Sequence, residues 1–115
     1  MRLRSVLPAV LGAGLLLAAV PAPASAAEGR FRYDYVTAEG YEATGFLNSP
    51  PDGECVDLPG VGDENPEPGH SPKNRTDAWA TVFTGTDCQG DSFTLRPHTG
   101  GASARLKVRS VVFSS

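Results

Sequence analysis

The stretch Asp77-Ala-Trp-Ala-Thr-Val-Phe-Thr84 has a clear alternation of side chains, and a period of two residues is typical of a β-strand. Every second residue from Trp79 to Phe83 points to one side, while Ala80 and Val82 point to the other. Because both sides are largely apolar, the pattern predicts a central strand of a sheet. It also predicts that the Trp79 ring lies in the core, and the alternative is an exposed platform for stacking against sugars.

Further short apolar segments occur on both sides of this stretch, and each predicts a strand. In the segment 92–96, the alternation places Phe93 and Leu95 on the inward side. Gly and Pro make up 18 of the 89 residues after Ala26, and no stretch of 11 residues keeps a helical period. The sequence therefore predicts an all-β fold, a small antiparallel sandwich. The other predicted strands are residues 31–36, 41–47, 55–58 and 106–113.

Residues 59–76 interrupt this series of strands. They contain four Pro and three Gly residues and lack a regular alternation, so we expect a long irregular loop. Loops of this length are usually functional or disordered.

The first 26 residues have the features of a secretory signal peptide. A start with two arginines precedes an apolar run over residues 6–20, and the segment ends in the small residues Ala24-Ser-Ala26. We expect cleavage after Ala26, with Ala24 and Ala27 as alternatives. The Ala-rich style of this segment is typical of bacteria. No second apolar run follows, so the sequence predicts a secreted, monomeric single domain over 27–115 that has no membrane contact after cleavage.

The predicted export also bears on the redox state of the two cysteines. Outside the cytoplasm, a lone pair such as Cys55 and Cys88 is expected to form a disulfide. The bond would close a loop of 34 residues, and the chain-entropy model gives a stabilisation of about 4 kcal/mol for such a loop.

The predicted domain is acidic, which bears on its partners. After Ala26 it has eight Lys and Arg residues against thirteen Asp and Glu residues, a net charge of −5. We expect no nucleic-acid partner for such a chain, because affinity for nucleic acid comes from the neutralisation of phosphates by cationic side chains. The segment 52–67 holds six carboxylates and no Lys or Arg, which predicts a solvated acidic loop.

The segment 79–113 resembles a βγ-crystallin Greek key. The resemblance is carried by Phe83-Thr-Gly-Thr-Asp-Cys88-Gln-Gly90, by the following Phe93 and Leu95, and by Ser110-Val-Val-Phe113. Cys88 stands where that motif has its second aromatic residue, so its anchoring role would pass to the disulfide. In the first half, Tyr41 and Phe46 have a suitable spacing, but Asn48 stands where the motif has Gly.

This resemblance implies a βγ-crystallin-like Greek-key sandwich. Proteins of this fold include secreted bacterial metalloproteinase inhibitors, and Cys55-Val56 is similar to the Cys-Val segment that those inhibitors present to the protease. The resemblance therefore implies an inhibitor-like binding protein with Cys55 and Val56 at the contact. The inhibitor family has two disulfides, whereas this chain has one pair of cysteines. The fold also occurs in a killer toxin, so a small antagonistic toxin is an alternative.

Motifs for enzymatic chemistry are missing from the sequence. It has neither a His-Glu-x-x-His zinc motif nor a Gly-x-Ser-x-Gly elbow, and Ser71 beside His70 is too weak a signal for a nucleophile and base. The calcium site of the crystallin motif needs carboxylates just before Ser110, where residues 105–109 are basic. We therefore expect no catalytic residues, no metal site and no cofactor.

The last predicted strand carries a basic stripe. Arg105, Lys107 and Arg109 alternate along it and would share one face, which predicts a binding site for anions. Such a site would suit a module that binds the cell surface or cell wall. The alternatives are a plain solvated face, or pairing with the acidic segment 52–67.

Overall fold

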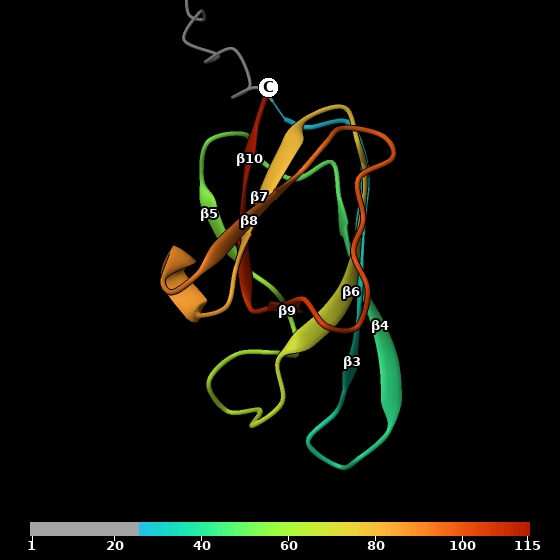
Figure 1. Cartoon of the computed structure of the whole chain (residues 1–115), viewed down its shortest axis with the longest axis vertical. Coiled ribbons are helices and arrows are strands. Elements are labelled where there is room, and N and C mark those ends of the chain that lie inside the picture. Colours follow the sequence, from blue (N-terminus) through green and yellow to red (C-terminus); the bar gives the residue numbers. More distant parts are fainter. Residues whose placement is uncertain (1–25) are drawn as a thin grey trace, which may run out of the picture.

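The computed structural model describes residues 26–115, and its regular elements there are β-strands and one 3₁₀ turn (Figure 1). Apart from Ala26, the predicted signal peptide lies outside the described residues. Within 26–115, no helix is long and apolar enough to cross a membrane. The elements are β3 (Gly29–Val36), β4 (Glu42–Asn48), β5 (Cys55–Asp57), β6 (Gly69–Thr76), β7 (Trp79–Phe83), η1 (Thr86–Cys88), β8 (Ser92–Leu95), β9 (Lys107–Val108) and β10 (Ser110–Ser114).

The strands form two four-stranded sheets, which confirms the predicted all-β fold. One sheet has the order β5-β10-β7-β8 and the other the order β4-β3-β6-β9. All neighbouring strands are antiparallel. The predicted central strand over residues 77–84 is β7, which pairs with β10 on one side and β8 on the other.

Each half of the chain gives one strand to the sheet of the other half. The strands β3, β4 and β6 of the first half share a sheet with β9 from the second. The strands β7, β8 and β10 of the second half share a sheet with β5 from the first. Neither sheet is therefore complete without the other half of the chain.

The core fills the space between the two sheets. Phe31 and Phe113 meet edge to face across it, with ring centroids 5.5 Å apart. Both are fully buried, and so is Tyr33, which follows Phe31 on the inner side of β3. The alternation predicted for residues 31–36 therefore places the aromatic residues inward as expected.

The expectation that residues 59–76 form one irregular loop is wrong in its second part. Residues 69–76 are β6, which pairs with β3 and also, at its start, with β9. Pro72 is tolerated because the register between β3 and β6 shifts beside it, and Ser71 takes a positive φ of 53° there. A proline inside a sheet is confined to such irregular positions or to an edge. The irregular segment that remains is 58–68.

The predicted burial of two aromatic side chains is also wrong. The side chain of Trp79 is 49% exposed and that of Phe93 is 53% exposed. On β7 the small residues Ala80 and Val82 face the core instead, where Phe31 and Phe113 already occupy much of the space. For Trp79, alternation predicts two faces but does not say which face is inner when both are apolar. Phe93 lies on the same side of β8 as the buried Leu95, but β8 is the edge strand of its sheet.

The predicted last strand, residues 106–113, is divided between the two sheets. Lys107 and Val108 form β9 beside β6, whereas residues from Ser110 onward form β10 between β5 and β7. The chain crosses from one sheet to the other at Arg109, which gives this residue an environment unlike that of its neighbours.

Candidate functional site

The disulfide and a folded hairpin join three elements on the outer side of one sheet. Cys55 of β5 is bonded to Cys88 of η1, which confirms the predicted pair. The buried Ser110 at the start of β10 accepts a hydrogen bond from the Cys88 backbone N–H (2.9 Å) and donates one to the Gly85 carbonyl (2.6 Å). Asp57 of β5 accepts a hydrogen bond from the Asp87 backbone N–H (2.7 Å). These bonds fix β5 and the hairpin against β10.

The segment 58–68, called the clamped loop from here on, is held in place by the Arg109 side chain. Arg109 lies where the chain crosses between the two sheets, and its guanidinium group contacts the backbone of the loop. It donates hydrogen bonds to four backbone carbonyl oxygens, those of Val61 (3.0 Å), Gly62 (2.8 Å), Asn65 (3.0 Å) and Pro66 (3.2 Å). Hydrogen bonds from a charged donor are stronger than neutral ones, so one side chain orders most of the loop.

The buried Asn65 side chain ties the clamped loop to itself and to β3. Its amide nitrogen donates to the carbonyl oxygens of Val36 (2.9 Å) and Gly60 (3.0 Å), and its amide oxygen accepts from the Glu67 N–H (3.0 Å). Every polar atom of this amide side chain is therefore used within the loop or beside it.

Tyr33 supports the beginning of the clamped loop from inside the sandwich. Its hydroxyl donates a hydrogen bond to the Pro59 carbonyl (2.6 Å). Burial raises the pKa of the Tyr33 hydroxyl well above the ordinary value of 10.0, and the nearby Tyr35 raises it further. Leu58 and Val61 are also buried and anchor the loop in the core.

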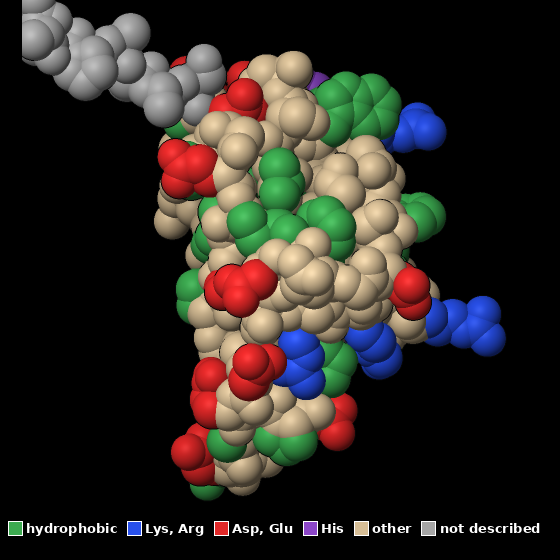
Figure 2. All heavy atoms as spheres, turned by 90° about the vertical axis from the view of Figure 1, so that its left-hand side faces the viewer, with side chains coloured by type: hydrophobic (Ala, Val, Ile, Leu, Met, Phe, Trp, Pro, Cys, Tyr) green, Lys and Arg blue, Asp and Glu red, His purple; other side chains and the backbone are tan. Residues whose placement is uncertain are grey.

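The outward side of the clamped loop carries carboxylates. Asp63, Glu64 and Glu67 are exposed, which confirms that this part of the predicted acidic loop faces solvent. In the face shown in Figure 2, acidic side chains lie above and below a central group of hydrophobic side chains. The loop therefore combines a fixed backbone with a charged and accessible outer side.

The two residues predicted to contact a protease lie on an edge strand. Strand β5 is at the end of its sheet, next to β10. The Val56 side chain packs against the core, opposite the buried Val111, whereas Cys55 faces outward and is held in the disulfide. Val56 is therefore partly covered by the core, and its contact with a partner stays a prediction.

The predicted basic stripe does not form one face of one strand. Arg109 is turned toward the carbonyl oxygens of the clamped loop, while Arg105 is exposed before β9. Lys107 lies in β9 and its ammonium group donates to the Ala104 carbonyl (2.7 Å). Arg109 bonds to backbone carbonyl oxygens of the acidic segment, and no ion pair with its carboxylates occurs among the described residues. Anion binding at these three residues stays a prediction.

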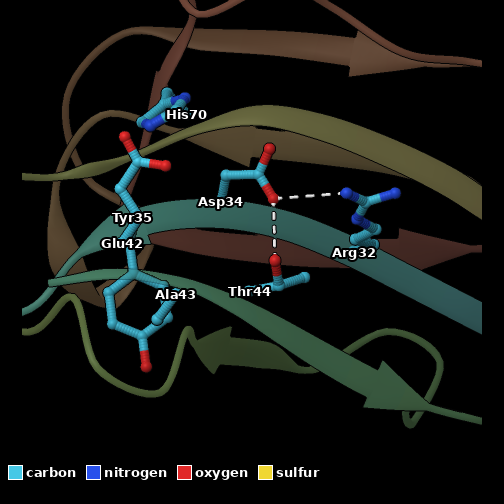
Figure 3. Close-up of a pocket in the computed structure, with 7 residues that line it drawn as sticks. All are labelled: Arg32, Asp34, Tyr35, Glu42, Ala43, Thr44 and His70. Carbon is cyan, nitrogen blue, oxygen red and sulfur yellow. Dashed lines mark hydrogen bonds and ion pairs between the residues drawn. The ribbon is translucent and has the colours of Figure 1, made fainter.

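The outer face of the other sheet has a polar depression that the sequence did not predict (Figure 3). Asp34 lies at its centre, where it accepts a hydrogen bond from the Thr44 hydroxyl (3.1 Å) and pairs with Arg32 (3.6 Å). The Glu42 carboxylate points toward His70, which lies at the rim. The outward-facing Arg32 and Asp34 could have indicated a polar site from the sequence. Their neighbours on β4 and β6 are known only once the pairing of the strands is known.

His70 and Ser71, considered as a base and nucleophile, do lie in contact. The His70 Nδ1 atom is 2.9 Å from the Ser71 hydroxyl oxygen. The contact follows from the positive φ of Ser71, which turns its side chain at the irregular point of β6. Among the described residues, no group of three or more His, Cys, Asp or Glu side chains is placed to hold a metal ion.

Comparisons of the chain with protein-family models, with curated proteins and with solved structures found no match.

Proposed function

We propose that this domain is an exported, non-enzymatic binding protein that presents the clamped loop to a protein partner, in the manner of an inhibitor of extracellular metalloproteases. The observation that carries the proposal is the set of four hydrogen bonds from Arg109 to the loop backbone. A loop that is already ordered loses little conformational entropy on binding. Inhibitory loops need this property, and they also need a backbone that does not adapt to the catalytic groups of the protease.

The surroundings of the loop support the same proposal. Strand β5 precedes it as an edge strand, and the disulfide from Cys55 to Cys88 holds that edge in place. An edge strand offers backbone groups that can pair with an extended segment of a partner. The contact surface proposed here therefore comprises the outer side of residues 58–68 together with the edge of β5, where Val56 is partly buried.

The topology supports the βγ-crystallin-like Greek-key fold that the resemblance implies. We propose that β3 to β6 and β7 to β10 are two Greek keys that interlock, because each contributes its third strand to the sheet of the other. The bonds of Ser110 to the folded hairpin support the assignment of the second key. Inhibitors of metalloproteases are among the several kinds of protein that share this fold, which supports the proposed function.

The direct experiment is a titration of a thermolysin-type metalloprotease with the purified protein, with a serine protease in parallel. We expect stoichiometric inhibition of the metalloprotease and an intact inhibitor afterwards. The double substitution E64K/E67K on the loop should weaken inhibition by about tenfold or more, because each changed charge lies at the proposed contact. The control E39K/D91K makes the same change of net charge at exposed positions outside the loop. Cleavage of the protein, or equal effects of both pairs, would contradict the proposal.

A further inference from the structure

Half of the cationic side chains of residues 27–115 lie on one face of one sheet. Arg30 and Arg32 of β3 lie beside Lys73 and Arg75 of β6, and together they surround Phe46 of β4 in a shallow depression. These five residues are called the basic patch from here on. The clamped loop contributes none of its lining residues.

Strand pairing brings like charges directly opposite each other in the basic patch. Arg30 is the register partner of Arg75, and Arg32 is the register partner of Lys73. Like charges in this position destabilise a sheet. Among the described residues, the one ion pair to any of the four is that of Arg32 with Asp34, at 3.6 Å. The repulsion between these cations lowers the stability of the folded protein, even though residues 27–115 as a whole carry a net charge of −5. A bound anion would remove this repulsion.

Phe46 gives the basic patch an apolar centre. Its side chain is 45% exposed, and the Arg30 guanidinium carbon lies 4.9 Å from the ring centroid. This cation–π contact holds the Arg30 guanidinium over the ring. On the other side of the patch, the Arg75 guanidinium also donates to the His98 carbonyl (3.4 Å). Together with Arg32, which pairs with Asp34, three of the four cations thus have a holding contact before any ligand binds.

We propose that the basic patch binds an anionic polysaccharide, a glycan chain with carboxylate or sulfate groups. The cations would pair with the acidic groups, and the exposed part of the Phe46 side chain would contact the C–H groups of a sugar ring. A nucleobase needs an open ring face for stacking, and Arg30 already lies over the Phe46 ring. Polyphosphate has no C–H groups that could contact the Phe46 ring. The depression also lies on the solvent-exposed face of its sheet, where an extended polymer can reach it.

The experiment measures binding of the full protein to polygalacturonate by calorimetry at about 50 mM salt, where surface charges are weakly screened. Uncharged dextran, polyphosphate and single-stranded DNA are the comparison ligands. We expect polygalacturonate to bind more tightly than any of the three, with an affinity that falls as salt rises. Absence of binding to polygalacturonate, or equally tight binding to DNA or polyphosphate, would overturn the proposal.

Three variants locate the site. We expect R30Q/R75Q to weaken polygalacturonate binding by about tenfold or more, because two cations at the contact are lost. The control R96Q/Q89E, which makes the same change of net charge at exposed positions outside the patch and outside residues 105–109, should leave the affinity within about twofold. F46A should weaken binding to polygalacturonate but not to polyphosphate. Equal losses in both double variants would show that net charge alone is responsible and would overturn the proposal.

Two further measurements distinguish a loss of polysaccharide binding from unfolding and from a loss of protease inhibition. Removal of one facing pair of like charges should raise, not lower, the urea concentration at which R30Q/R75Q unfolds. A loss of binding in that variant is therefore not explained by unfolding, and a lower midpoint would contradict the argument from charge. Inhibition of a metalloprotease by R30Q/R75Q should be unchanged, so that failure of either proposal leaves the other standing.

Discussion

Arg109 illustrates how one residue connects the fold to the proposed function. Its position at the crossing between the two sheets places the guanidinium under the clamped loop, where it satisfies four carbonyl oxygens. The loop lies over the end of the sandwich without a regular strand of its own. Its backbone order therefore depends on side chains, above all on Arg109 and Asn65.

The first prediction concerns the substitution Arg109→Gln. We expect the free energy of unfolding to fall by about 2 kcal/mol, because several charge-assisted hydrogen bonds are lost and the freed carbonyls are partly buried. Urea denaturation followed by the fluorescence of Trp79 would measure the change. The control Arg105→Gln removes an exposed charge of the same type and should change stability by less than about 0.5 kcal/mol. An equal and small effect of both would show that the clamp is energetically unimportant.

The second prediction concerns alkaline pH and Tyr33, whose hydroxyl pKa is raised by burial. In the unfolded chain a tyrosine loses its proton near pH 10, whereas Tyr33 in the folded protein keeps it to a higher pH. The contribution of Tyr33 is therefore complete below about pH 10 and declines as pH rises above that value, by up to about 1.4 kcal/mol per pH unit.

The variant Tyr33→Phe isolates this effect from the other groups that titrate in alkali. Near neutral pH it should be less stable than the wild type by about 1 kcal/mol, because the hydrogen bond to Pro59 is lost. The difference between the two proteins should shrink as pH rises from about 10 to 11. A constant difference across that range would contradict the raised pKa of Tyr33.

At the scale of elements, β6 is the strand on which the arrangement depends most. It pairs with β3 and β9, and its buried Asn74 also reaches the chain beyond the sheet. The Asn74 amide nitrogen donates to the carbonyl oxygens of Ala78 (2.8 Å) and Arg96 (3.0 Å). Its amide oxygen accepts from the Thr76 hydroxyl (2.6 Å). This network joins β6 to the turn into β7 and to the end of β8.

We expect Asn74→Ala to lower the free energy of unfolding by about 3 kcal/mol, since it leaves several buried polar groups without partners. The exposed Asn48 on β4 offers a matched control, and Asn48→Ala should have an effect below about 0.5 kcal/mol. Thermal and urea unfolding of the two variants would provide the comparison. Similar small losses in both would contradict the structural role given to Asn74.

Strand β6 is also the strand that the sequence pattern failed to predict. Segments with a plain alternation, such as residues 31–36 and 77–84, are strands in the structure. Residues 69–76 contain no apolar side chain apart from that of Pro72, so the local pattern gives no sign of β6. Its inward positions are filled by small polar residues that bond to one another, which only the assembled sheets reveal.

The candidate sites were predictable to a similar extent. The Cys55–Cys88 bond followed from counting cysteines, because two cysteines allow one pair. The clamp by Arg109 and the basic patch did not follow, because they need the register of β3 with β6 and the crossing from β9 to β10. Such contacts join residues more than 40 positions apart and have no local signal.

At the scale of the whole molecule, stability depends on the exchange of strands between the halves. β5 is held in the second sheet by its pairing with β10 and by the disulfide to η1. The two sheets share one core, so the halves are not expected to fold separately. The disulfide supports this arrangement by linking the first half to the second.

We expect reduction of the disulfide to lower the free energy of unfolding by up to about 4 kcal/mol, the value that chain entropy gives for this loop length. Urea denaturation with and without a thiol reductant would measure it, and the oxidised mass should be two hydrogens lower. The double variant C55S/C88S should behave like the reduced protein and should be insensitive to the reductant. Identical midpoints for the oxidised and reduced wild type would contradict the contribution assigned to the bond.

The measurement that tests the central claim most directly is the inhibition constant for a metalloprotease of the wild type beside R109Q and R105Q. The account predicts tight, stoichiometric inhibition by the wild type and by R105Q. It predicts inhibition weakened by about tenfold or more in R109Q, because that variant must order the clamped loop on binding. Equal inhibition by all three proteins, or none by the wild type, would contradict the claim that Arg109 prepares this loop for recognition.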